Sequence, residues 1–195
     1  MTPETLLDIL SKAAELKTTV RHCFTAENRQ ESVADHSWRI ALMAMLLSKE
    51  EEFQKLDMDK VIRMCLIHDL GETFTGDIPT FRKTASDTKK EDSLFEEWLS
   101  SFPSPQREEW SDLLKEMEQM KSPEAKTYKA LDKLEAVISH NESDISTWIP
   151  LEYDLQFTYG KESVQFSEYL KALSESIDWQ TRKKIDAHIR READK

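Results

Sequence analysis

Four residues of this sequence combine the types and the placement of ligands for one metal ion. His36 lies on the inward face of a predicted helix, and Asp132 lies in the apolar seam of another. His68 and Asp69 directly follow the apolar run at the end of a third predicted helix. Burying two unpaired carboxylates is costly, and a divalent cation shared by both would remove that cost. Two imidazoles and two carboxylates are a normal ligand set for a transition metal.

Taken singly, each of these residues has a simpler explanation. A lone histidine on an apolar face is more often a hydrogen-bonded core residue, and a lone helical aspartate is more often solvated or salt-bridged. The next residues favour chemistry, because Glu72 follows His68 by four positions and projects from nearly the same side. A carboxylate there could take a proton from metal-bound water. Asp77, on the loop beyond, could bind a substrate hydroxyl or could cap a turn.

The elements that must position these residues are predicted to be helices. The chain has 195 residues and only 3 glycines, which leaves few places for hairpin turns. Leu, Ala, Met, Glu and Lys are plentiful, and no segment shows a convincing alternation typical of a strand. The sequence therefore predicts an all-α, single-domain helical bundle over residues 1–195 with the metal site in its core.

Helical periodicity and capping residues give the approximate bounds of these elements. In chain order we expect helices over 2–17, 32–49, from 57 or 59 to 70, one or two over 87–121 with a break at 103–105, then 122–140, 163–176 and 179–193. Residues 18–31 are polar and non-periodic and predict a loop. Thr2 is the expected N-cap of the first helix. The apolar stripe expected for that helix is Leu6, Leu7, Leu10 and Ala14.

Composition limits the partners and the location of the protein. The formal net charge of −11 argues against a nucleic-acid polymer, because duplex binding relies on neutralising phosphates with Lys and Arg. A small phosphorylated substrate is not excluded, since one metal and one or two arginines can make a local positive pocket. No stretch predicts a membrane span or a signal peptide. Cys23 and Cys65 do not suggest disulfides, and we expect a cytoplasmic protein.

Three segments resemble the signature stretches of a known superfamily. They are Glu31-Ser-Val-Ala-Asp-His36, then His68-Asp-Leu-Gly-Glu-Thr-Phe-Thr-Gly-Asp-Ile-Pro-Thr80, and the helix around Leu131-Asp-Lys-Leu-Glu135. The chain resembles the HD-domain metal-dependent phosphohydrolase superfamily, and most closely its 5′-deoxynucleotidase branch. The similarity spans about residues 5–175. The second segment is the most specific, because other branches follow His-Asp with different residues.

The resemblance implies an HD-type helical bundle that hydrolyses the phosphate ester of deoxyribonucleoside 5′-monophosphates. Members of the family use a divalent transition metal and are commonly homodimers. The residues that match the family's functional positions are His36, His68, Asp69 and Asp132 for the metal, Glu72 for water activation, Asp77 for the sugar and Arg21 for the phosphate. We further expect Asp69 to help protonate the leaving oxygen.

The chain departs from the family at His22, where a tryptophan often packs against the sugar and rejects a 2′-hydroxyl. An imidazole is smaller and can hydrogen-bond, so the choice between deoxyribose and ribose is open; His22 could equally be an exposed loop residue. No histidine lies between His68 and Asp132, where two-metal members need extra histidines. We therefore expect one divalent transition metal, which could be Mn, Co, Fe, Ni or Zn.

Three alternatives stay open on the sequence alone. The enzyme could act on another small phosphorylated metabolite, although the stretch 76–79 favours the nucleotidase branch. The chain could instead be a non-catalytic binding module stapled by a metal, which would need neither Glu72 nor Arg21. It could also be a plain helical bundle without a metal.

Overall fold

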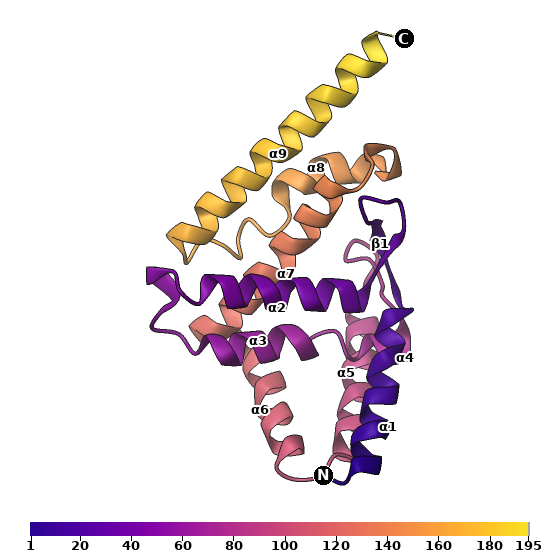
Figure 1. Cartoon of the computed structure of the whole chain (residues 1–195), viewed down its shortest axis with the longest axis vertical. Helices are drawn as coiled ribbons and strands as arrows, with labels where there is room; N and C mark the ends of the chain where they lie inside the picture. Colours follow the sequence, from indigo (N-terminus) through magenta and orange to yellow (C-terminus); the bar gives the residue numbers. More distant parts are fainter. Residues whose placement is uncertain (195) are drawn as a thin grey trace.

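Most of the chain is helical in the computed structural model, which describes residues 1–194, and the predicted all-α class is confirmed (Figure 1). The helices are α1 (Pro3–Ala13), α2 (Val33–Leu47), α3 (Met58–Ile67), α4 (Glu72–Thr75), α5 (Ala85–Ser100), α6 (Gln106–Gln119), α7 (Pro123–Glu142), α8 (Pro150–Thr158) and α9 (Glu168–Ala193). Short 3-10 turns are η1 (Ala14–Lys17), η2 (Glu51–Phe53) and η3 (Ile145–Thr147), and the strands are β1 (Val20–Phe24) and β2 (Gln30–Ser32).

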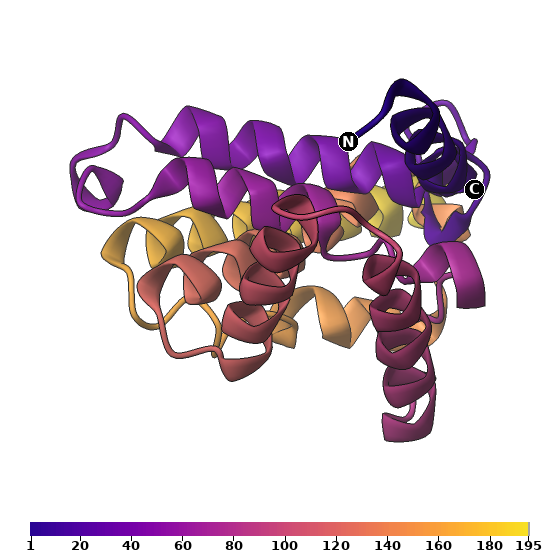
Figure 2. The same cartoon turned by 90° about the horizontal axis from the view of Figure 1, so that it is seen from below.

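The centre of the molecule is formed by α2, α3 and α7, which pack against one another. Figures 1 and 2 show α2 and α3 running side by side, and α7 passes behind both in the view of Figure 1. Burial of one large aliphatic side chain contributes roughly 1.5–3 kcal/mol, so the shared core fixes the relative positions of these helices. Its fully buried members include Ile40, Ala44, Val61, Met64, Leu131 and Leu134.

Local capping signals fix where the central helices begin and therefore which residues face inward. The Ser32 hydroxyl accepts a hydrogen bond from the N–H of Asp35 at 3.1 Å, and the Asp35 carboxylate accepts one from the N–H of Ser32 at 2.9 Å. This capping box starts α2 at Val33 and turns His36, in the first helical turn, into the core, where it is fully buried. Ser122 caps α7, which begins one residue after the predicted start.

Residues 18–31 form most of a β-hairpin, so the predicted loop and the expected absence of strands are both wrong. β1 pairs antiparallel with β2, with Val20 opposite Ser32 and an irregular register beyond. The strands have five and three residues, and Cys23 is the single buried residue of β1. Such short strands show no period of two. The hairpin instead depends on α7, against which β1 packs.

The first predicted helix is present as α1 followed by η1, and Thr2 caps it as predicted. The apolar stripe predicted to face the core is wrong, because its four residues are all exposed: Leu6, Leu7, Leu10 and Ala14. The stripe that faces inward has the same helical spacing but is shifted by one residue, and it consists of Ile9, Ala13 and Leu16. Both stripes are apolar, so the packing of Ile9 with Leu99 and Phe102, at the C-terminal end of α5, decides which one is buried (Figure 1).

The later helices differ from the prediction mainly at their ends. The segment 87–121 forms α5 and α6, divided near the predicted proline break. The two helices predicted over 163–176 and 179–193 are one continuous α9. The helix continues through residues 177 and 178. Ile177 is buried there, and Asp178 accepts a hydrogen bond from Lys161 at 2.5 Å. Helix α8 was not predicted from the sequence.

Candidate metal centre and substrate pocket

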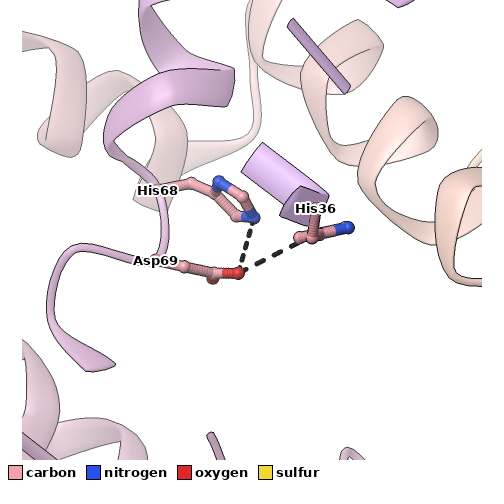
Figure 3. A group of neighbouring side chains, drawn as sticks. All are labelled: His36, His68 and Asp69. Atoms are coloured by element: carbon pink, nitrogen blue, oxygen red, sulfur yellow. Dashed lines mark ion pairs between the residues drawn. The ribbon is translucent and has the colours of Figure 1, made fainter. Parts of the chain in front are cut away.

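The four predicted metal ligands come together at the centre of the molecule. His36 lies in α2, and Asp132 lies in the middle of α7. His68 and Asp69 directly follow α3. Nε2 of His36 is 3.1 Å from Oδ1 of Asp132 and 3.8 Å from Oδ2 of Asp69. Nε2 of His68 is 2.9 Å from the same Asp69 oxygen and 3.8 Å from the same Asp132 oxygen. Figure 3 shows His36, His68 and Asp69 directed toward one another.

The hydrogen bonding of His68 leaves one ring nitrogen facing two acceptors. Its Nδ1–H donates to the carbonyl oxygen of Cys65 at 2.9 Å, so Nε2 carries the lone pair. This nitrogen is buried and has no hydrogen-bond partner among residues 1–194, yet oxygens of Asp69 and Asp132 face it. A lone pair opposite two carboxylates is repulsive unless a cation or a proton lies between them. The donor set therefore fits a metal ion, with one atom each of His36, His68 and Asp69 within 4.8 Å of one another.

Glu135 holds His36 in the orientation that a metal ligand requires. Nδ1–H of His36 makes a short hydrogen bond to Oε2 of this fully buried carboxylate. Ser139 donates to its Oε1 at 2.6 Å. Because Nδ1 is engaged by Glu135, Nε2 is the nitrogen that faces Asp132 and Asp69 and can bind a cation between them, and the carboxylate makes the imidazole a stronger ligand. No role was predicted for Glu135; its position in the apolar seam, three residues after Asp132, indicates burial but not its partner His36.

The charges around the centre favour a bound cation. Burial opposes protonation of His36, but hydrogen bonds to Asp132 and Glu135 outweigh burial and raise its pKa to about 9. Burial likewise opposes ionisation of Asp132, yet the ammonium of Lys129, 2.7 Å away, helps to lower the pKa of this carboxyl well below its usual range. The carboxylates of the cluster thus stabilise a positive charge between them. Without a metal this charge is the proton of His36, and a divalent metal would replace it.

Arg21, the predicted phosphate contact, lies beside the metal ligands and is bonded to two carboxylates. Its Nη1 donates to Glu31 at 2.8 Å and to Glu135 at 3.3 Å. These bonds tie β1 to β2 and to α7 and keep the guanidinium largely buried, with 15% of the side chain exposed. A guanidinium carries five N–H donors in a planar fork. The two bonds through Nη1 therefore leave donors for an anion.

Glu72, the predicted base, is the first residue of α4 and is buried. Its Oε2 has no hydrogen-bond partner in the part of the chain that the structure describes. Burial, together with the negative charges of Asp69 and Asp77, raises the pKa of its carboxyl to about 10. The ammonium of Lys83 acts in the opposite direction, as a bound cation would. A metal ion at the centre would thus favour the carboxylate form that a base needs.

An open pocket of about 790 Å³, including solvent at its mouth, is lined by Arg21 but by none of the four predicted metal ligands. Arg21 links it to the ligand cluster, because it donates to Glu135, the partner of His36. The three predicted substrate contacts, Arg21, His22 and Asp77, all line it. His22 lies on β1 rather than in a loop, and its ring packs edge-on against Phe81 with centroids 5.6 Å apart. Apolar and aromatic side chains complete the lining, among them Phe81, Val137, Leu155 and Tyr159. Such a lining suits the organic part of a small ligand.

Known proteins resemble the chain over most of its length. Residues 13–174 match the model of the HD domain family. The human 5′-deoxynucleotidase HDDC2 is 32% identical over 141 residues, which cover 70% of this chain and 67% of that protein. The 5′-deoxynucleotidase hdd1 of Schizosaccharomyces pombe is 27% identical over 169 residues, covering 83% and 77%. A predicted metal-dependent phosphohydrolase from Magnetospirillum magnetotacticum MS-1 has a crystal structure with a TM-score of 0.76, 27% identity and 93% coverage of each chain.

The fold, the clustered ligands and these relatives define a metal-dependent phosphohydrolase, as the sequence predicted. The chain belongs to the HD domain family. The predicted resemblance to the 5′-deoxynucleotidase branch is confirmed by the two named relatives. The family and the ligand cluster confirm a divalent-metal site, without fixing which metal it binds. The role of each residue stays a prediction.

Proposed function

We propose that the protein hydrolyses nucleoside 5′-monophosphates to a nucleoside and inorganic phosphate, using one divalent metal ion held by His36, His68, Asp69 and Asp132. One observation carries the proposal: imidazole nitrogens and carboxylate oxygens from three segments converge beside a pocket that Arg21 lines. The names of the relatives from human and fission yeast support this substrate class.

The residues of the site divide the reaction among them. A divalent cation, when bound, would acidify a water molecule and offset charge on the phosphoryl oxygens. Glu72 takes the proton of the attacking water, whose oxygen bonds to phosphorus while the bond from phosphorus to the 5′ oxygen breaks. Arg21 donates to the phosphoryl oxygens, and Asp77 accepts a hydrogen bond from the sugar. The leaving oxygen takes up a proton; donation of this proton by Asp69 stays a prediction.

Phosphate release from a panel of substrates tests the proposal. Metal-free protein is reconstituted separately with Mn²⁺, Co²⁺, Fe²⁺, Ni²⁺ or Zn²⁺, all of which suit the ligand set. Deoxyribonucleotides, ribonucleotides and sugar phosphates are then compared. We expect metal-dependent turnover of nucleoside monophosphates above that of sugar phosphates. The ribose arm reports whether His22 admits a 2′-hydroxyl.

A matched pair of variants ties the activity to the metal centre. Asp132→Ala should remove both phosphate release and bound metal, measured by elemental analysis. Asp112→Ala replaces an aspartate on α6 whose side chain is 81% exposed, and it should change neither. Full activity of the metal-stripped protein, or of Asp132→Ala, would contradict the proposal.

We infer that the chain forms a homodimer through the outer face of α2. Trp38, Met45 and Leu46 are 63%, 54% and 65% exposed, and helical spacing places them along one stripe. An exposed apolar stripe of this kind is typical of a subunit contact. Light scattering should give a dimer mass for the protein and a monomer mass for Trp38→Glu; a monomeric parent protein would refute the inference.

Among residues 1–194, no helix is both long and apolar enough to cross a membrane. The cytoplasmic location expected from the sequence stays a prediction.

A further inference from the structure

Glu152, His22 and His140 form a polar cluster in the pocket, apart from the metal ligands. Glu152 lies on α8 with 4% of its side chain exposed, and its Oε1 is 3.1 Å from Nε2 of His22 and 3.5 Å from Nε2 of His140. Both Oε1 of Glu152 and Nε2 of His22 are buried, and neither makes a hydrogen bond within the described residues. A buried carboxylate oxygen that faces two imidazole nitrogens but receives no well-formed hydrogen bond is only partly compensated, so a ligand that donates a hydrogen bond to it would be favoured.

The structural role of Glu152 accounts for only one of its two oxygens. Oε2 accepts a hydrogen bond from the N–H of Ile149 at 2.7 Å, where α8 begins. This bond fixes the carboxylate and leaves Oε1 beside His22 and His140, which line the pocket with Glu152. Capping the helix needs no second oxygen, so Oε1 is available to a ligand.

Helix α7 connects this polar cluster with the metal centre. Asp132, Ala136 and His140 are spaced four residues apart and therefore lie along one face of the helix. Ala136 and His140 both line the pocket. Eight residues at the helical rise place His140 about 12 Å along the axis from Asp132. A substrate with its phosphate at the metal centre would reach Glu152 with its opposite end, which in a nucleoside monophosphate is the base.

The chemistry around Glu152 suits a nucleobase. Burial, with the positive charge of Arg21, lowers the pKa of His140 to about 4. At pH 7 this imidazole is therefore neutral and does not compensate the carboxylate charge. Phe81 and Tyr159 line the same pocket and offer aromatic surface to a planar ring. Bases carry N–H groups from which a carboxylate accepts hydrogen bonds, whereas the sugar hydroxyls are assigned above to Asp77.

We propose that Glu152 determines specificity for the base: its Oε1 accepts a hydrogen bond from an N–H group of the nucleobase, between the flanking rings of His22 and His140. The proposal rests on the function proposed above, because it takes the phosphate to lie at the metal centre.

The first test compares a nucleotide with a substrate that has no base. The readout is the ratio of kcat/KM for dAMP to kcat/KM for 2-deoxyribose 5-phosphate. Glu152→Gln can keep the bond from Ile149 through its amide oxygen, but it then presents an NH₂ donor where Oε1 lay. We expect the ratio to fall about tenfold or more, through a higher KM for dAMP. Asp154→Asn, at an exposed position of the same helix, should leave the ratio unchanged. An unchanged ratio in Glu152→Gln overturns the proposal.

The second test leaves the protein unaltered and so does not depend on the folding of a variant. Purine 2′-deoxyriboside 5′-monophosphate resembles dAMP but has no N–H group on its base. The wild-type enzyme should use it about tenfold less efficiently than dAMP; equal efficiency overturns the proposal. If the wild-type protein releases phosphate from no substrate, the proposed function fails by itself. Calorimetry with deoxyadenosine then decides on Glu152: weaker binding to Glu152→Gln supports its role, and equal binding refutes it.

Discussion

Glu135 should control how tightly the centre binds its metal, although it is not a predicted ligand. It receives the Nδ1–H of His36 and is also bonded by Arg21 and Ser139. Burial favours its neutral form, but His36 and Arg21 lower its pKa to about 2. The residue is therefore ionised at neutral pH. Glu135→Gln would keep the shape and an oxygen for His36 while removing one negative charge.

The expected loss follows from how such groups act on metal sites. Removing the carboxylate behind a ligating histidine typically weakens metal binding about 10–100-fold, which corresponds to about 1.4–2.8 kcal/mol. We expect the Kd of Glu135→Gln for Zn²⁺ or Mn²⁺ to rise by that factor. Competition with a chromophoric chelator measures it directly.

The matched control is Glu31→Gln. Glu31 is also buried, with 5% of the residue exposed, and shares Arg21 and Ser139 as partners. One of its oxygens lies within 4.8 Å of a His36 nitrogen, but among residues 1–194 it makes no hydrogen bond or ion pair to His36. Glu31→Gln should therefore leave the Kd for the metal nearly unchanged. Equal metal affinity of Glu135→Gln and the wild-type protein, or an equal loss in both variants, would refute the reasoning.

Replacing Glu72 with Ala should abolish phosphate release while metal content, measured by elemental analysis, is retained; normal turnover would remove Glu72 from the reaction. Acid should destabilise the protein through His140, because burial lowers its pKa from 6.5 to about 4. Between these values the unfolded chain binds the extra proton, so stability is full above pH 6.5 and falls as the pH drops, by up to about 3 kcal/mol. Urea unfolding at pH 7 and pH 4.5 should show a smaller difference for His140→Gln, and an identical difference would exclude this source. Gly76→Ala should lower the free energy of unfolding by about 1–3 kcal/mol, because Gly76 has φ +74° and ψ 165°, a backbone conformation that is nearly exclusive to glycine, even though an added Cβ would meet nothing within 4 Å. Unaltered thermal stability would contradict this strain.

The ligand cluster could be predicted because its signals are local. His68 and Asp69 are neighbours at a helix end, and helical periodicity alone turns His36 and Asp132 inward. Glu135 and Glu152 could not be assigned in this way. The bond between His36 and Glu135 joins residues 99 positions apart, and Glu152 matters only because α8 brings it to β1. Their roles come from tertiary contacts that no local pattern records.

The errors in the fold have the same origin. Alternative apolar stripes run along α1, and the contact with α5 rather than the pattern itself decides that Ile9 is buried and Leu7 exposed. The hairpin is too short to show a strand period and is fixed by its packing on α7. Where a segment's structure depends on its neighbours, periodicity predicts the element less well than it does for α2 or α7.

Anomalous diffraction from crystals of the metal-reconstituted protein tests the central claim most directly. We predict a single strong peak about 2.0–2.2 Å from Nε2 of His36, Nε2 of His68 and carboxylate oxygens of Asp69 and Asp132. A peak beside other side chains would contradict the claim. So would metal that is bound in solution assays but gives no peak between these four residues.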